Sequence, residues 1–258
     1  MEHDLLAIRP MAQGAGSIPF ELEALSNAVR YQQWVFDLLE PHLGQRIIEF
    51  GAGVGNLSKW LPLRERLILT EFDPYLLEIL RTSTDQIRKA HHGVTVEPFD
   101  LSRDDPSRYF GDHLDTVVSF NVLVHVEDDL GALERQIAIL KNSKAPGPKR
   151  VCFFVPAHLW AYGTMDQTFG HFRRYSASMV RNLVKKVDPT AVIQARYFNL
   201  PGLVGWLLQG RILKKTSFGV ESVKAFEALC PLIRAVDSLA HFVRLPLGQS
   251  LLCVVTLR

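Results

Sequence analysis

The sequence has few cysteines, no excess of one charge and no long uncharged apolar run. Its 258 residues include only Cys152, Cys230 and Cys253, which are too far apart for a disulfide framework or a cysteine metal site. We therefore predict a reduced, cytoplasmic protein with no bound metal. No apolar stretch reaches the roughly 20 residues that a membrane-spanning helix needs, and the acidic residues 1–4 are wrong for a secretory signal.

Composition limits the partners and the number of domains. Lys and Arg total 29 against 27 Asp and Glu, and no basic run dominates one segment, so charge gives no case for nucleic acid. Hydrophobic residues make up 47% of the chain, which is enough to bury a full core. We predict a single domain over residues 1–258, as a monomer or homodimer.

A glycine-rich turn follows an apolar strand near residue 50. Residues 47–50 end in Glu49 and Phe50, and residues 51–56 read Gly-Ala-Gly-Val-Gly-Asn. Glycine permits positive φ and removes the Cβ, so a nucleotide-type ligand can lie against the backbone. The apolar spacing after Asn56 predicts a short helix whose free N–H groups face that ligand.

A second strand, residues 67–70, ends in carboxylates about 20 residues beyond the first glycine, where doubly wound folds place the acid that binds ribose hydroxyls. Glu71 lies at the tip of this strand and is the predicted ribose ligand. Asp73 precedes Pro74 and is placed to cap the helix predicted over residues 75–81.

The turn lacks the third glycine of the dinucleotide pattern. Its spacing is GxGxG with Asn56 directly after, whereas pyrophosphate binding uses G-x-G-x-x-G. Glu49 would repel a diphosphate but attract an ammonium or sulfonium cation. S-Adenosylmethionine has both cations and no phosphate, which makes it the predicted cofactor, with an NAD-dependent reductase as an alternative.

These features resemble the motifs of class I S-adenosylmethionine-dependent methyltransferases over residues 45–130. The resemblance implies an α/β, Rossmann-like fold with a seven-stranded, mostly parallel sheet, an antiparallel last strand and helices on both faces. It also implies that Asp100 accepts the adenine amino hydrogen and that residues 121–126 flank the methionine portion. The implied contacts of S-adenosyl-L-methionine and its product S-adenosyl-L-homocysteine are Glu49, Gly51, Ala52, Gly53, Gly55, Asn56, Glu71, Phe72, Asp100, Leu101, Asn121 and Val122.

A narrower resemblance involves the segment after the fifth strand. Residues 162–166 and 170–176 look like the "D…GHxRRYS" block of small bacterial methyltransferases. Tyr31 and Trp34 are similar to the helix that covers the methionine end of the cofactor in that subgroup, although their spacing alone is also typical of core packing. The subgroup implies no single acceptor.

Two histidines are candidates for the chemistry, because methyl transfer to a hydroxyl requires alignment of the acceptor and removal of a proton. His171 follows the fifth strand at the carboxyl edge of the sheet and is the predicted base or acceptor orienter. His125 is the second candidate, as a wall or cofactor contact. Alternatively, His171 belongs to a structural polar network with Asp166, Arg173 and Arg174. The predicted acceptor contacts are Tyr162, Asp166, Arg174, Tyr175 and Asn199, of which Asn199 also fits an ordinary turn.

The C-terminal third exceeds a minimal methyltransferase core. Strands predicted over residues 191–197 and 251–257 flank a helical insertion, residues 199–245, apolar enough to cover an acceptor pocket, dimerise or rest on a membrane. Residues 1–44 are the predicted N-terminal helical cap, with the first 18 flexible or lid-like. Residues 45–155 are the predicted cofactor-binding core, and residues 156–258 the acceptor side.

Three functions remain open. The first is methyl transfer to an O or N atom of a small molecule, such as a secondary metabolite. The second is methylation of a lipid-linked or glycan acceptor at a membrane surface, favoured by Arg211, Lys214 and Lys215 beside the apolar insertion. The third is a protein that binds S-adenosylmethionine without catalysis.

Overall fold

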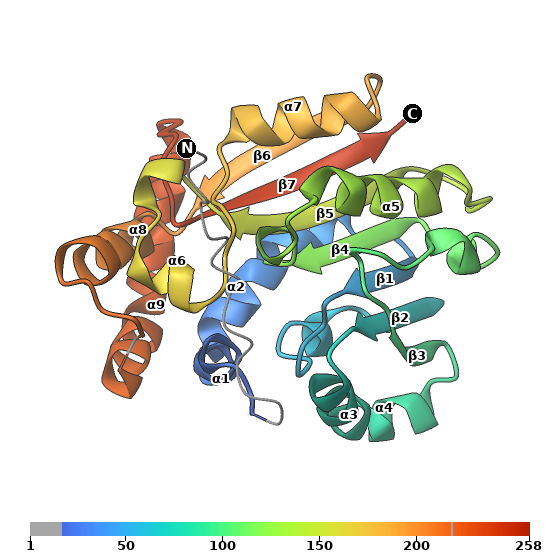
Figure 1. Ribbon diagram of the computed structural model, residues 1–258, viewed down its shortest axis with the longest axis horizontal. Helices are drawn as coiled ribbons and strands as arrows, with labels where there is room; N and C mark the ends of the chain where they lie inside the picture. The colour runs from blue at the N-terminus through green and yellow to red at the C-terminus, as the bar shows by residue number, and fades with distance from the viewer. Residues whose placement is uncertain (1–16, 218) are drawn as a thin grey trace, which may run out of the picture.

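The computed structural model, which describes residues 17–217 and 219–258, has a central seven-stranded sheet between two layers of helices (Figure 1). The sheet order is β3-β2-β1-β4-β5-β7-β6, and β7 runs antiparallel to both neighbours while the other pairs are parallel. This confirms the predicted fold class. The strands are β1 (Arg46–Phe50), β2 (Arg66–Glu71), β3 (Val94–Pro98), β4 (Thr116–Phe120), β5 (Lys149–Pro156), β6 (Val192–Phe198) and β7 (Ser250–Leu257).

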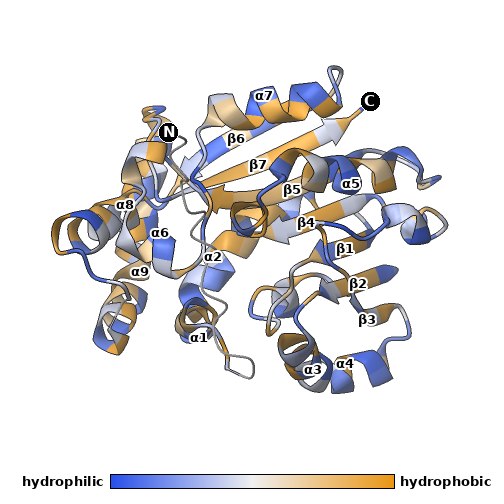
Figure 2. Cartoon of the chain, viewed as in Figure 1, coloured by the Kyte–Doolittle hydropathy of each residue, from blue (hydrophilic) through white to orange (hydrophobic). Residues whose placement is uncertain are grey.

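Helices cover both faces of the sheet. One apolar cluster joins the sheet to α5 (Asp129–Lys141) and α7 (Ala177–Val187), and a second joins it to α2 (Val29–Leu39), α3 (Pro74–Ser83) and α9 (Val220–Phe242). Because both faces are covered, the central strands are buried and rich in apolar residues, and Figure 2 shows β5 largely in the hydrophobic colour. The remaining elements are α1 (Phe20–Ser26), α4 (Asp85–Ala90), α6 (Thr164–Thr168), α8 (Leu200–Trp206), the short 3₁₀ turns η1 (Glu40–His42), η2 (Ser58–Trp60), η3 (Pro106–Tyr109), η4 (Leu123–His125) and η5 (Leu159–Ala161), and the π-helical segment η6 (Leu207–Ile212).

The topology creates a crevice beside β1. This strand pairs with β2 on one side and β4 on the other, and the connections that follow β1 and β4 lead to strands on opposite sides of this pair. In open α/β sheets such a switch point is where ligands bind. The glycine turn follows β1 and Asn121 follows β4, which places both predicted site segments at this crevice.

The segment after the glycine turn differs from its prediction. The expected short helix is only the single 3₁₀ turn η2, in which the N–H groups of Trp60 and Leu61 donate to the carbonyls of Leu57 and Ser58. Pro62 disfavours helical conformation at the preceding Leu61, so the turn cannot continue. The prediction that Asp73 caps α3 is confirmed, because its carboxylate accepts from two N–H groups at the start of that helix, at 2.9 and 3.0 Å.

The predicted insertion between the last two strands consists of α8, η6 and α9. Asn199, with a left-handed φ of 63°, caps α8 by accepting from the N–H of Gly202 at 3.0 Å. Nothing among the described helices is both long enough and apolar enough to span a membrane. The predicted flexible or lid-like segment falls almost wholly outside the described residues.

Candidate active site

The glycine turn depends on backbone conformations that other residues rarely adopt. Gly51 and Gly53 have φ of 66° and 58°. A Cβ on Gly51 would also lie 2.6 Å from the side chain of Val122, so this position has no room for one. The turn after β1 is therefore closely packed against the segment that follows β4.

Glu71 closes the other side of the turn. One carboxylate oxygen accepts from the N–H of Gly53 at 2.9 Å, and the other from the N–H groups of Phe72 and Asp73 at 2.8 and 3.0 Å. Burial raises the pKa of Glu71, against the lowering effect of these three donors. The ring of Phe72 is 63% exposed beside it, free to contact a flat ligand.

Glu49 is buried beneath the turn, with 1% of its surface exposed. Burial, with a further contribution from Glu71, raises the pKa of Glu49 to about 8, although Ser58 opposes the shift. One carboxyl oxygen has no hydrogen-bond partner among the described residues. An unpaired buried oxygen of this kind is a natural acceptor for a cationic or N–H donating ligand.

The tips of β3 and β4 complete the crevice. Leu101 is buried, and the carboxylate of Asp100 accepts from the N–H of Ser102 and pairs with Arg103, both at 2.9 Å. Asn121 has a left-handed φ of 55°, and its side-chain oxygen has no partner among the described residues. Sparsely populated backbone conformations of this kind cluster at functional sites.

The two candidate histidines lie together, with His125 in η4 after β4 and His171 in the loop between α6 and α7. The Nδ1 atom of His171 is 2.9 Å from the carboxylate of Asp166, which also accepts from Arg174 Nε at 2.8 Å. Burial opposes protonation of His171, but Asp166 and Glu21 outweigh it and raise its pKa. The ring of His125 lies 4.9 Å from that of His171, centroid to centroid.

Glu21 of α1 faces both histidines. Its carboxylate oxygens lie 3.5 Å from Nε2 of His125 and 3.7 Å from Nε2 of His171. Burial would raise the pKa of Glu21, but the two imidazoles lower it to about 2. The sequence reasoning missed this residue, since nothing in the local pattern of α1 distinguishes Glu21 from other surface acids.

A cavity of about 310 Å³ opens between this cluster and the insertion. Four predicted site residues line it, namely Tyr31, Asn121, His171 and Asn199. Three aromatic side chains form apolar parts of its wall, namely Phe169, Trp206 and Phe226 of α9. The cavity thus combines apolar walls with several polar groups, which suits a small molecule that has an apolar body and polar substituents.

The other predicted acceptor contacts lie behind the cavity wall. Arg174 is buried, donates to the Ala157 carbonyl at 3.0 Å and stacks over Trp206 at 4.3 Å. The Tyr175 hydroxyl donates to Asp129 at 2.8 Å, and that of Tyr162 to the His171 carbonyl at 2.8 Å. With Asp166, these side chains brace the loop that carries His171.

Three further predicted contacts have identifiable surroundings. Trp34 is buried and packs edge-on against Phe198, away from the cavity that its neighbour Tyr31 lines. Ala52 is buried in the turn itself. The side chain of Asn56 donates to the Leu22 carbonyl at 2.7 Å and thereby ties the turn to α1.

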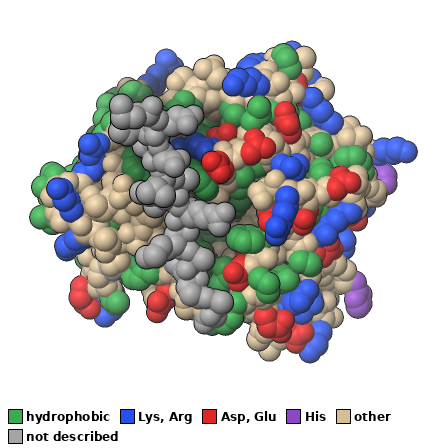
Figure 3. Space-filling view, viewed as in Figure 1, with side chains coloured by type: hydrophobic (Ala, Val, Ile, Leu, Met, Phe, Trp, Pro, Cys, Tyr) green, Lys and Arg blue, Asp and Glu red, His purple; other side chains and the backbone are tan. Residues whose placement is uncertain are grey.

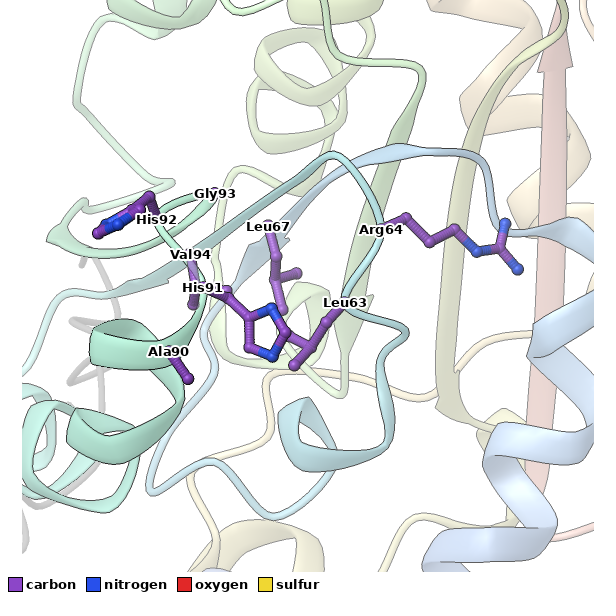
Figure 4. A pocket seen from close by; sticks show the side chains of 8 residues that line it. All are labelled: Leu63, Arg64, Leu67, Ala90, His91, His92, Gly93 and Val94. Atoms are coloured by element: carbon purple, nitrogen blue, oxygen red, sulfur yellow. The ribbon is translucent and has the colours of Figure 1, made fainter.

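A second hollow, of about 240 Å³, lies at the amino ends of β2 and β3 (Figure 4). It is lined by Leu63, Arg64, Leu67, Ala90, His91, His92, Gly93 and Val94. His91 and His92 are both exposed and their rings do not converge. This hollow lies at the opposite end of the strands from the predicted site, and none of its described lining residues has an unpaired buried polar atom.

Comparison with known proteins supports the fold assignment. No protein-family model matches the sequence, and no curated protein matches it. Among solved structures, the chain is similar to an S-adenosylmethionine-dependent methyltransferase from Mesorhizobium loti, at 13% identity and a TM-score of 0.57 over 90% of this chain and all of the other. The fold is therefore that of class I S-adenosylmethionine-dependent methyltransferases.

Two other solved structures have the same fold. One is a methyltransferase from Thermotoga maritima described as a possible histamine N-methyltransferase, with 12% identity, a TM-score of 0.54 and coverage of 92% of this chain and 95% of that one. The other is the methyltransferase domain of a bacterial Hen1 protein, with 15% identity, a TM-score of 0.54 and coverage of 90% and 98%. At these identities the similarity concerns the fold.

Proposed function

We propose that this protein transfers a methyl group from S-adenosylmethionine to an O or N atom of a small molecule held in the 310 Å³ cavity. The observation that carries the proposal is the pair of unpaired buried oxygens on Glu49 and Asn121, beside the glycine turn. Buried polar atoms are normally satisfied, so these two acceptors favour a ligand with N–H donors or a positive charge.

The residues at the crevice fit this cofactor. Glu49 and Asn121 would hold the ammonium group, whose positive charge would favour ionisation of Glu49. Glu71 would hold the ribose hydroxyls and Asp100 the adenine amino group, with Phe72 and Leu101 against the ring. When bound, the cofactor supplies an electrophilic methyl group on a sulfonium. Gly51, Ala52, Gly53, Gly55, Asn56 and Val122 would shape the cradle, and Tyr31 would face its open end from the cavity wall.

The acceptor side offers groups for orientation and proton uptake. His171 and Glu21 border the cavity, and His125 adjoins both. Asp166 fixes the His171 ring, as a buried carboxylate does in many catalytic histidine pairs. Glu21, His125 and His171 would orient the nucleophilic atom of the acceptor, while the aromatic side chains of the cavity wall would hold its apolar body.

Cofactor binding by the wild type and the Glu71→Ala variant tests the proposal. Calorimetry should show S-adenosylmethionine binding by the wild type and a loss of about 1.5 to 3 kcal/mol in the variant, or roughly 10- to 150-fold in Kd, from lost bonds to a charged acceptor. Glu78→Ala, an exposed position on α3, is the matched control and should bind normally. Tighter binding of NAD, or unchanged affinity in Glu71→Ala, would contradict the assignment. Binding without product formation from any acceptor would favour the non-catalytic alternative.

A second candidate function is the same reaction on a lipid-linked or glycan acceptor at a membrane surface. The supporting observation is the exposed apolar face of α9, where Leu232, Leu239 and Phe242 are 63%, 64% and 84% exposed. Exposed Arg211 and two lysines lie in the same insertion, and Figure 3 shows hydrophobic and basic side chains together at the left edge. This combination favours an anionic lipid surface.

We also propose that the protein acts in the cytoplasm. Cys152, Cys230 and Cys253 are all buried and unpaired. Unpaired cysteines are the usual state in a reducing compartment.

A further inference from the structure

Three side chains from separate segments converge at one point beside the cavity. Glu21 belongs to α1, His125 to η4 and His171 to the loop between α6 and α7. One ligand atom from each, a carboxylate oxygen and two imidazole nitrogens, lies within 4.8 Å of the other two. Segments this far apart in the chain place two histidines and a carboxylate together only through the tertiary fold.

The hydrogen bonds of His171 leave one nitrogen without a partner. The Asp166 carboxylate, which already accepts from Arg174, also accepts from Nδ1 of His171, and this assigns the imidazole proton to Nδ1. In the neutral ring, Nε2 is then an acceptor that faces a second acceptor, the Glu21 carboxylate, at 3.7 Å. This Nε2 has no hydrogen-bond partner among the described residues, and the side chain is only 4% exposed. Two opposed acceptors at this distance repel each other unless a proton on Nε2 or a metal ion lies between them.

We propose that Glu21, His125 and His171 bind a divalent transition-metal ion such as Zn²⁺, Mn²⁺ or Co²⁺. Metal–ligand bonds of about 2.0 to 2.2 Å place the ligand atoms of one ion roughly 3.0 to 3.5 Å apart. One Glu21 oxygen lies 3.5 Å from His125 Nε2 and the other 3.7 Å from His171 Nε2, and one ligand atom from each of the three residues lies within 4.8 Å of the others, so the site would contract when an ion binds. Two imidazole nitrogens favour these ions over Mg²⁺ and Ca²⁺, which prefer all-oxygen ligands.

The surroundings match those of metal-binding histidines. Such histidines usually donate their second ring N–H to a carboxylate, as His171 does to Asp166. Arg174 holds that carboxylate in turn and is itself fully buried. Three protein ligands leave coordination positions open, and the cavity borders Glu21 and His171, so a bound molecule can reach them.

The role of the ion rests on the proposed function. An acceptor hydroxyl would take an open position, and the positive charge would lower its pKa so that its proton is lost to solvent. The resulting oxygen would then attack the methyl carbon of the cofactor, and the C–S bond would break with its electron pair remaining on sulfur. The inferred substrate class is therefore an alcohol or phenol whose oxygen binds the metal.

Direct metal binding tests the inference without any acceptor. Metal-free protein is titrated with Co²⁺ and Zn²⁺ by calorimetry, and Co²⁺ coordination is followed by visible absorption. We expect one ion per chain, a loss of affinity of at least tenfold in Glu21→Gln and in His125→Ala, and no detectable binding in His171→Ala. Glu23→Gln, an exposed position on the same helix, is the matched control and should bind normally.

Glu21 and His125 are partly exposed, so their variants should keep the wild-type melting temperature and provide the test if His171→Ala fails to fold. Absence of binding to the wild type, or undiminished affinity in both Glu21→Gln and His125→Ala, would overturn the metal site. S-Adenosylmethionine binding is measured separately on the metal-free protein. Metal binding without cofactor binding would refute the proposed function and leave the metal site standing, whereas the reverse result would refute only the metal site.

Discussion

At the scale of single residues, Glu49 couples the site to pH. It is buried beneath the glycine turn, and burial raises its pKa to about 8, well above the ordinary value for a glutamate. The folded protein therefore keeps a proton on this group over a range in which the unfolded chain has lost it. A raised carboxyl pKa contributes stability that is fully present below about pH 4.5 and is lost as pH rises towards 8.

The Glu49→Gln variant should remove this pH dependence. Between pH 5 and 8, deprotonation of Glu49 alone should lower the wild-type free energy of unfolding by roughly a few kcal/mol. The variant should lack this contribution, so its free energy of unfolding should change less with pH. Thermal or urea unfolding at several pH values measures both slopes. Glu134→Gln, an exposed position on α5, should keep the wild-type slope. Parallel wild-type and Glu49→Gln slopes would contradict the prediction.

Single residues also mark the limit of inference from sequence. The glycines and Glu71 were identifiable because their roles follow from strand ends and spacing along the chain. Glu21 was not, because its position depends on how α1 packs over residues far away in sequence. Trp34 and Tyr31 have the same helical spacing, yet only the structure separates the packing residue from the one that lines the cavity. The prediction of no bound metal considered the three distant cysteines, whereas Glu21, His125 and His171 come together only in the folded chain.

At the scale of elements, α1 is weakly attached although it contributes Glu21. None of its residues is fully buried. Its hydrogen-bonded connection to the glycine turn is Asn56, which donates to the Leu22 carbonyl at 2.7 Å and accepts from the Ser26 hydroxyl at 2.8 Å. Helices with so little buried area open at a lower free-energy cost than the central strands.

The Asn56→Ala variant should loosen α1 selectively. Loss of two hydrogen bonds lowers the local opening free energy by about 1 to 3 kcal/mol, so α1 amides should exchange roughly 5- to 150-fold faster in hydrogen-exchange mass spectrometry. Peptides from β1 and β4 should keep their protection. Asn142→Ala, which removes an exposed bond at the end of α5, is the control for a lost asparagine side chain. Unchanged exchange in α1 would show that other contacts hold it.

Helices and strands were predicted well where hydrophobic periodicity and segment length indicated the same element. They were predicted less well where a proline interrupted a helical pattern. The alternation of strands and helices gave the sheet, and the apolar segment between the last two strands gave the insertion. The helix expected after the glycine turn was wrong, because Pro62 limits the segment to one 3₁₀ turn. The sequence analysis expected the insertion to cover an acceptor pocket, but the contribution of α1 to the cavity could not be predicted, because α1 meets the other walls only in the folded chain.

At the scale of the whole molecule, we propose that the exposed face of α9 contacts another partner. Its large apolar side chains are Leu229, Leu232, Val236, Leu239, Phe242 and Val243. A contiguous exposed apolar surface usually marks an interaction site. With exposed basic residues nearby in the same insertion, an anionic membrane is the surface that suits it best.

Vesicle binding tests this surface. The protein should co-sediment with vesicles rich in phosphatidylglycerol, bind less to phosphatidylcholine vesicles and lose binding as salt increases, because the basic residues contribute electrostatically. Leu239→Glu with Phe242→Glu should reduce binding at least tenfold. Leu63→Glu, a partly exposed leucine at the distant hollow, is the matched control. Absence of vesicle binding together with a dimer mass in light scattering that the double variant abolishes would instead assign the face to a second copy.

The position of β7 affects the order in which the molecule is assembled. This strand lies between β5 and β6, so β6 has no partner in the sheet until β7 has been synthesised. The ribosome adds about 5 to 20 residues per second, and during the seconds between the two strands the edge of β5 has no neighbour. The strands that carry the proposed cofactor site, β1 to β4, are therefore all synthesised before the last wall of the cavity, at Gln249 and Ser250, exists.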